Sequence, residues 1–115
     1  MNTSKIYKTY DIVLVPFPFV ESSLVKKRPA LVVSSSEFNN KSKHSALVMI
    51  TSTAIKWPLD ILINDFKNAG LSMQSIIRMK YFSLPNKLII KKIGHLSSKD
   101  KENFQRNFAT LFQDI

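Results

Sequence analysis

Residues 11–19 read DIVLVPFPF, and this run of β-branched and aromatic side chains sets the fold class. Such side chains favour an extended, half-buried strand, so the run predicts the first strand of a sheet. Pro16 and Pro18 have no backbone N–H and cannot donate to a strand ladder. The second half of this strand is therefore expected at a sheet edge or at a bulge.

Five further strands are expected downstream of this run. Pro29 fixes the entry of the strand 28–34, and the near-continuous apolar run 46–52 predicts a buried central strand. The remaining three strands are expected at residues 59–63, 75–82 and 88–93. Polar and turn-forming segments predict a loop at 20–27, a loop at 34–40 with room for one helical turn, and a turn at 68–71.

The C-terminal segment predicts one amphipathic helix. Ser97 and Asp100 form an S-x-x-D signature, which is typical of a helix N-terminus. Downstream of it, apolar side chains recur at helical spacing: Phe104, Phe108, Leu111, Phe112 and Ile115. Such a helix lies either on the sheet or on a partner molecule. Six short strands closed by this helix predict a mainly β protein with helices, built as a small curled antiparallel sheet or partly open barrel.

Length and composition limit the classes of protein that fit. The 115 residues suit one domain, 1–115. The chain has no cysteine, which excludes disulfides, thiolate catalysis and cysteine-bound zinc, and only His44 and His95 could offer an imidazole to a metal. No apolar run approaches the roughly 18 residues of a membrane span, so we expect a soluble, cytoplasmic protein without a membrane contact.

The excess of positive charge indicates a polyanionic partner. Lys and Arg number 17 against 8 Asp and Glu, giving a net charge of +9, and they are spread along the chain. A basic face assembled by folding attracts nucleic acid through counterion release. An acidic protein inhibitor would suit the same charge, and a basic surface that serves only solubility is the plain alternative.

Five segments stand in a specific order and spacing, although each alone would be uninformative. They are DIVLVPFPF at 11–19, KRPALVV at 27–33, MITS at 49–52, GL at 70–71 followed by SIIR at 75–78, and KIGHL at 92–96. Together they span nearly the whole chain and resemble the MazF/PemK family of toxin endoribonucleases. Two features depart from the family pattern: Tyr10 stands where a glycine usually precedes the first strand, and the loop 20–27 has no glycine.

The resemblance implies a fold, a set of partners and an activity. The fold would be an SH3-like, partly open barrel of the PemK/CcdB-like toxin type, assembled as a homodimer. The partners would be single-stranded RNA and a cognate acidic antitoxin that occupies the RNA groove. The chain would be the toxin of a type II toxin–antitoxin system. Its activity would be sequence-selective cleavage of RNA, without metal or cofactor, to leave 2′,3′-cyclic phosphate and 5′-hydroxyl ends.

The family motif implies that Arg28 and Thr51 are the catalytic residues. The sequence has no Ser-His-Asp order, paired carboxylates or P-loop, but RNA carries its own nucleophile, the 2′-hydroxyl. The enzyme then has to align that oxygen with the leaving 5′-oxygen and stabilise the phosphorane. We expect Arg28 to act electrostatically and Thr51 to orient the phosphate, because a guanidinium with a pKa above about 12 is a poor base at neutral pH. Without the motif, both would be interpreted as ordinary strand residues.

Eight further residues are candidates for RNA contacts: Glu21, Ser22, Ser23, Lys26, Lys27, Ser52, Trp57 and Arg78. The first three belong to the loop facing the expected groove, and the two lysines suit phosphate contacts. Alternation along a strand would point Ser52 away from Thr51. Trp57 suits stacking on an unpaired base. Arg78 suits a phosphate contact or an ion pair at a dimer interface.

Two rival interpretations stay open at this point. One is a protein of the same fold that binds nucleic acid or poisons DNA gyrase without cutting RNA, and the other is an inactive relative kept for its interactions. The presence of both Arg28 and Thr51 favours the enzyme. We expect His44 to be an exposed loop residue and His95 to be structural, with neither of them catalytic and no residue binding a metal.

Overall fold

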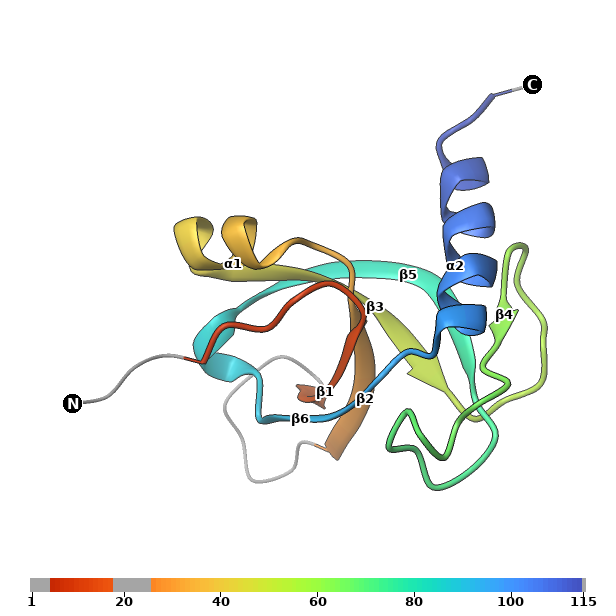
Figure 1. Ribbon diagram of the computed structural model, residues 1–115, viewed down its shortest axis with the longest axis horizontal. Coiled ribbons are helices and arrows are strands. Elements are labelled where there is room, and N and C mark those ends of the chain that lie inside the picture. The colour runs from red at the N-terminus through yellow and green to blue at the C-terminus, as the bar shows by residue number, and fades with distance from the viewer. Residues whose placement is uncertain (1–4, 18–25, 115) are drawn as a thin grey trace.

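One antiparallel sheet with two short helices makes up the protein, for which a computed structural model describes residues 5–17 and 26–114 (Figure 1). The elements in chain order are β1 (Asp11–Phe17), β2 (Lys26–Val32), α1 (Ser36–Ser42), β3 (His44–Thr51), β4 (Ile61–Leu62), β5 (Ile76–Pro85), the 3-10 turn η1 (Asn86–Leu88), β6 (Lys91–His95) and α2 (Ser98–Leu111). The spatial order of the strands is β4-β5-β3-β2-β1-β6. The sheet curls into a half-open barrel, which confirms the mainly β, partly open barrel expected from the sequence.

Each face of the sheet carries its own hydrophobic cluster, because side chains alternate along a strand. Ile12 and Leu31 belong to a cluster that includes Phe104 of α2, and we call this side the α2 face. Val13 and Ala30 point to the opposite face and belong to a second cluster. The parity of a residue in β1, β2 or β3 therefore tells which face its side chain joins.

The second half of the first strand lies at a sheet edge, as its prolines predict, whereas the bulge lies in the first half. β6 pairs with β1 only from Asp11 to Leu14, and the register shifts between Ile12 and Val13. Pro16 lies beyond the end of this pairing and faces only β2, where it is opposite Lys27. The missing N–H of Pro16 therefore costs no ladder hydrogen bond to β6.

Several boundaries differ from those expected from the sequence. The segment 34–40 is not a loop with one turn, because α1 has 7 residues. Ser35 caps this helix by accepting a hydrogen bond from the Phe38 backbone N–H at 3.1 Å. The strand expected at 59–63 shrinks to the 2 residues of β4, preceded by Leu59 with a φ of 66°. β2 begins two residues early, at Lys26, and β5 runs on to Pro85.

The capping prediction for α2 is confirmed, and the burial of its aromatic side chains decreases towards the C-terminal end. Ser97 accepts a hydrogen bond from the Asp100 N–H at 3.2 Å, and the Asp100 carboxylate accepts from the backbone N–H groups of Asn64 and Asp65, each at 3.0 Å. Phe104 is buried on the sheet, whereas Phe112 is 70% exposed. The helix rises away from the sheet in Figure 1, and in its second half Phe108 and Leu111 are only partly buried against the cluster on the α2 face.

Candidate functional site

Arg28 and Thr51 lie on neighbouring strands at the end of the sheet opposite α1. β2 and β3 pair with Ala30 opposite Met49, so the antiparallel register continued by two residues brings Arg28 opposite Thr51. Both residues share parity with Ala30 and Leu47, whose side chains belong to the cluster facing away from α2. The two side chains therefore point to the same face of the sheet.

Two adjoining hollows form a groove around this pair. The first, of about 150 Å³, is lined by Phe17, Arg28, Met49, Ile50, Thr51, Arg78 and Lys80. The second, of about 170 Å³, is lined by Arg28, Pro29, Ile50, Thr51, Ser52, Leu71, Ser72, Met73 and Ser75. Arg28 and Thr51 line both hollows, so they stand at the centre of what we call the central groove.

The first hollow is strongly basic. Arg28, Arg78 and Lys80 come from β2 and β5, and no Asp or Glu is among the described residues that line either hollow. The Arg28 guanidinium lies 5.6 Å from the centroid of the Phe17 ring, a cation–π distance that restrains an otherwise exposed side chain. A cleft lined by one sign of charge concentrates polyanions, and the planar fork of an arginine matches two phosphoryl oxygens.

A buried carboxylate fixes Arg78 beside this groove. Asp60 accepts hydrogen bonds from Arg78 Nε at 3.2 Å and Nη2 at 2.8 Å, and from the backbone N–H groups of Lys56 and Trp57 at 2.9 and 2.8 Å. Burial alone would raise the pKa of Asp60, but these hydrogen bonds outweigh it and hold the pKa below its ordinary value. The Trp57 ring centroid lies 5.2 Å from the Arg78 guanidinium and 5.8 Å from Lys80 Nζ. Asp60 thus positions both the cation and the aromatic ring.

The other buried carboxylates also have structural partners. Asp11 accepts from the Lys8 N–H at 3.0 Å and faces His95 Nδ1 and Lys92 Nζ, each at 3.1 Å. Burial would raise the pKa of Asp11, yet these contacts lower it, so the group stays ionised at neutral pH. Asp100 serves the α2 cap described above.

Within residues 5–17 and 26–114, no three His, Cys, Asp or Glu side chains gather as metal ligands would, and no helix is long and apolar enough to cross a membrane.

The sequence of the chain matches a known protein family. A family model described as PemK-like, MazF-like toxin of type II toxin–antitoxin system matches residues 8–112. This chain belongs to that family. No curated protein matches the sequence significantly.

Solved structures share the fold of this PemK/MazF-like chain. An endoribonuclease from a mycobacterial species has a TM-score of 0.74 at 12% identity, over 95% of this chain and 93% of that chain. MazF from Deinococcus radiodurans has a TM-score of 0.72 at 16% identity, over 93% and 96%. A mycobacterial endoribonuclease in complex with its cognate antitoxin has a TM-score of 0.71 at 14% identity, over 90% and 92%. At these identities the likeness establishes the fold alone.

Several residues that the sequence nominated meet in the groove of this PemK/MazF-like chain. Arg28, Thr51, Ser52 and Arg78 line it, and Trp57 adjoins it through its contact with Arg78. Ser52 lies just after the end of β3, where the chain bends, and lines the second hollow together with Thr51. Arg78 forms an ion pair within the chain, with Asp60.

The remaining candidates, which are two lysines and three loop residues, and the two histidines lie in different parts of the chain. Lys26 and Lys27 belong to β2 and not to the preceding loop. Alternation gives Lys26 the parity of Arg28 and turns Lys27 to the α2 face, so only Lys26 is expected to contact a ligand in the groove. Glu21, Ser22 and Ser23 lie outside the described residues. His44 is exposed, as expected, but it begins β3 and is not in a loop. His95 Nδ1 lies 3.1 Å from Asp11 Oδ1, a contact that favours the structural role expected for it.

The departure at Tyr10 has a conformational explanation. Tyr10 has a φ of 77°, in the left-handed region where glycine meets no steric cost. A tyrosine does meet a steric cost at this φ, and contacts of its side chain with α2 offset it. The hydroxyl accepts a hydrogen bond from Gln105 Nε2 at 2.8 Å, and the ring lies edge-on to Phe104 with centroids 6.2 Å apart. Tyr10 therefore ties the start of β1 to the C-terminal helix.

The sequence did not point to Lys80, which lines the groove, or to Asp60, which holds Arg78 beside it. Lys80 could have been found, because it stands two positions after Arg78 and must share its face of a strand. Asp60 gave no local signal, because its role depends on a partner 18 residues away, on β5.

Proposed function

We propose that this chain is a metal-independent endoribonuclease that cuts single-stranded RNA in the central groove, as the toxin of a type II toxin–antitoxin pair. The observation that carries the proposal is the meeting of Arg28 and Thr51 in one basic hollow of a PemK/MazF-like fold. The names of the neighbouring solved structures, which are endoribonucleases, support the same activity. The net charge of +9 supplies the long-range attraction for RNA.

The proposed reaction needs no nucleophile from the protein. The 2′-oxygen of one ribose attacks the adjacent phosphorus, the O2′–P bond forms and the P–O5′ bond breaks, which leaves a 2′,3′-cyclic phosphate and a 5′-hydroxyl. One proton leaves the 2′-hydroxyl and one is added to the departing 5′-oxygen. Arg28 donates two hydrogen bonds to the non-bridging oxygens as charge accumulates on them, and the Thr51 hydroxyl orients the phosphate for in-line attack.

Arg28 is assigned an electrostatic role in preference to acid–base catalysis. A guanidinium stays protonated throughout the physiological pH range, so it is a poor base. The buried carboxylates are hydrogen-bonded elsewhere, and Asp60 and Asp11 have lowered pKa values that disfavour them as general acids. Proton exchange with water at the exposed groove is therefore part of the proposal.

We also propose an acidic antitoxin as the protein partner. A relative of the same fold is known in complex with its cognate antitoxin. An acidic segment would be attracted to the three cations of the first hollow, Arg28, Arg78 and Lys80, and would compete there with RNA.

Cleavage that survives metal removal is the first expected result. The purified protein, incubated with a long single-stranded RNA in excess EDTA, should cut it as fast as in Mg²⁺, and the new ends should be 5′-hydroxyls that a kinase can label directly. The 2′-hydroxyl mechanism requires the same RNA to be uncut when each ribose carries a 2′-deoxy or 2′-O-methyl group. Loss of cleavage in EDTA with recovery in Mg²⁺, or products with 5′-phosphates, would contradict the proposal. Binding without cutting would favour the non-catalytic alternative.

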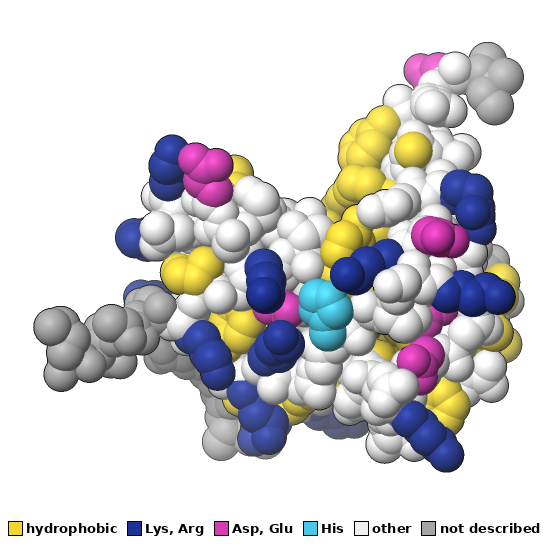
Figure 2. Space-filling view, in the orientation of Figure 1, with side chains coloured by type: hydrophobic (Ala, Val, Ile, Leu, Met, Phe, Trp, Pro, Cys, Tyr) yellow, Lys and Arg dark blue, Asp and Glu magenta, His cyan; other side chains and the backbone are white. Residues whose placement is uncertain are grey.

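A homodimer is the second expected result, and it rests on an exposed aromatic cluster at the end of α2. Phe112 is 70% exposed and Tyr81 is 42% exposed. Their rings contact each other and Phe108, with centroids 5.4–6.2 Å apart. Figure 2 shows hydrophobic side chains following α2 towards its C-terminal end. Contiguous apolar surface of this kind marks a protein interface.

Sedimentation at micromolar concentration should therefore give a particle of twice the 13.2 kDa chain mass. Phe112→Ser should weaken dimerisation at least about tenfold, because a central aromatic contributes roughly 1–2 kcal/mol or more to an interface. Phe38→Ser is the matched control, because Phe38 is also exposed, at 51%, but lies on α1 outside the cluster. A 13.2 kDa particle for the wild type would refute the dimer.

A further inference from the structure

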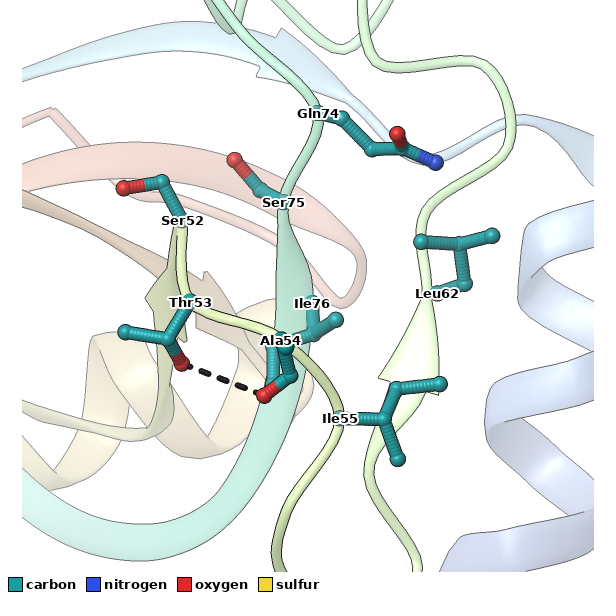
Figure 3. Close-up of a pocket in the computed structure, with 8 residues that line it drawn as sticks. All are labelled: Ser52, Thr53, Ala54, Ile55, Leu62, Gln74, Ser75 and Ile76. Atoms are coloured by element: carbon teal, nitrogen blue, oxygen red, sulfur yellow. Dashed lines mark hydrogen bonds between the residues drawn. The ribbon is translucent and has the colours of Figure 1, made fainter.

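The central groove continues past Thr51 into a third hollow. This hollow has a volume of about 270 Å³ and lies between residues 52–55, Leu62 of β4 and residues 74–76 at the start of β5 (Figure 3). It shares Ser52 and Ser75 with the hollow that holds Arg28 and Thr51. Ser52 directly follows Thr51, so the two Cα atoms are about 3.8 Å apart. A ligand held at Thr51 is therefore within reach of this third hollow.

The chemistry of the third hollow differs from that of the first two. Its lining mixes apolar side chains, among them Ala54, Ile55 and Leu62, with uncharged polar side chains that provide the larger share of its surface, and none of its lining residues carries a charge. A phosphate would find no cation there, whereas a flat, uncharged ring with polar edges would find apolar side chains to pack on and polar groups for hydrogen bonds. Nucleobases of single-stranded RNA have this character, and proteins recognise them by burying the ring and hydrogen-bonding its edges.

Two polar groups on the rim are available to a ligand. The Ser75 hydroxyl donates to the Met73 carbonyl at 2.9 Å, and the Thr53 hydroxyl donates to the Ala54 carbonyl at 3.4 Å. Among the described residues, by contrast, the Gln74 amide and the Ser52 hydroxyl have no hydrogen-bond partner. In Figure 3 the Gln74 side chain extends from the start of β5 across to the side of Leu62. An amide offers one acceptor and two donors, which is enough for a two-point contact with a base edge.

We propose that this third hollow is a base-selecting pocket, which receives an unstacked nucleobase next to the scissile phosphate, and that Gln74 selects the base through its side-chain amide. This inference rests on the proposed RNA cleavage and adds a specificity-determining residue to it. A two-point hydrogen bond between an amide and a base is worth about 1–3 kcal/mol of discrimination, or roughly 5–150-fold between bases.

The experiment maps the cut sites of the full chain on a single-stranded RNA of randomised sequence. Wild type should favour one base strongly at a position beside the cut. Gln74→Leu keeps the bulk but loses the amide, and it should reduce the preference at that one position by roughly 5–150-fold while the preferences elsewhere persist. Gln74→Glu exchanges the donors for acceptors, so it should shift the preference towards bases whose edges present amino groups.

Asn40→Leu and Asn40→Asp are the matched controls. Asn40 is an exposed amide on α1, at the opposite end of the sheet, and the two changes remove the same amide or add the same charge. Both variants should cut with the wild-type preference. Ala54→Phe is a second, independent test, because it fills the pocket while residue 74 stays a glutamine, and it should weaken the same single-position preference.

The outcomes separate the two proposals. A wild type that cuts no RNA refutes the proposed function. A wild type that cuts, with Gln74→Leu and Ala54→Phe folded and keeping an unchanged preference at every position, refutes the base pocket and leaves the activity standing. Cleavage without any base preference next to the cut would also refute the pocket. Melting curves of each variant identify any loss that comes from unfolding, and Gln74 is exposed, so its variants are expected to fold.

Discussion

Arg28→Ala is expected to cut RNA at least about 10²–10³-fold more slowly than wild type in single-turnover experiments. The guanidinium stands in the hollow that also holds Thr51, and its proposed task is to stabilise charge that develops only in the transition state. Loss of one such preorganised donor costs several kcal/mol of transition-state stabilisation. RNA affinity should fall much less, because Arg78 and Lys80 still line the same hollow.

A graded series tests the electrostatic role of Arg28 against a role in proton transfer. Arg28→Lys keeps the charge but loses the two-pronged fork, so it should recover only part of the rate. Thr51→Val should cost less than Arg28→Ala, and Thr51→Ser should keep most of the activity because the hydroxyl persists. If Arg28 does not exchange protons, Arg28→Lys should also leave the shape of the pH–rate profile unchanged.

The histidines provide the controls for this series. His44→Ala and His95→Ala should each change the rate by less than about threefold at a temperature where both variants are folded. His44 is exposed at the far end of β3, and His95 pairs with the structural Asp11, which keeps Lys92 as a second partner. A histidine variant as inactive as Arg28→Ala, with normal thermal stability, would move the catalytic centre away from Arg28.

The features that the sequence predicted well are those with local causes. The edge of β1 at Pro16 follows from its missing N–H group, and the start of α2 follows from Ser97 and its spacing to Asp100. In both cases, the sequence within a few residues already contains the physical reason. The pairing of Arg28 with Thr51 has no such local cause and was implied by the family motif.

Features that the sequence could not give depend on contacts between distant segments. Helix α1 has a cap at Ser35, but its asparagines and serines are weak helix formers, so its length depends on the burial of Asn39, whose amide donates to the Tyr7 carbonyl at 2.8 Å. β4 is short because the chain turns through a positive φ at Leu59, which no sequence rule favours for leucine. The Asp60–Arg78 pair and the third hollow likewise exist only after β5 pairs with β3.

Gly94→Ala is expected to destabilise the fold severely, because two glycines make the closest approach between β6 and the turn after β4. A Cβ on Gly94 would lie 2.0 Å from the Ala69 carbonyl oxygen, and a Cβ on Gly70 would lie 1.9 Å from the Ile93 carbonyl oxygen. Both obstacles are backbone atoms, so no side-chain rotation can relieve them. We expect a loss of about 3 kcal/mol or more in the free energy of unfolding, and a melting temperature lower by roughly 10 °C.

Comparison with the Gly70 variants distinguishes this steric effect from backbone strain. Gly70 has a φ of 81°, a conformation that asparagine tolerates better than alanine does. If the close approach dominates, Gly70→Asn and Gly70→Ala should be destabilised to a similar extent, whereas strain alone would let asparagine recover most of the stability. Because one contact serves both glycines, the double variant Gly70→Ala/Gly94→Ala should lose less stability than the two single losses added together. Full additivity in chemical denaturation would contradict a shared contact.

Leu71 lines the central groove directly after Gly70, so variants that still fold should also cut RNA more slowly than their stability alone would explain.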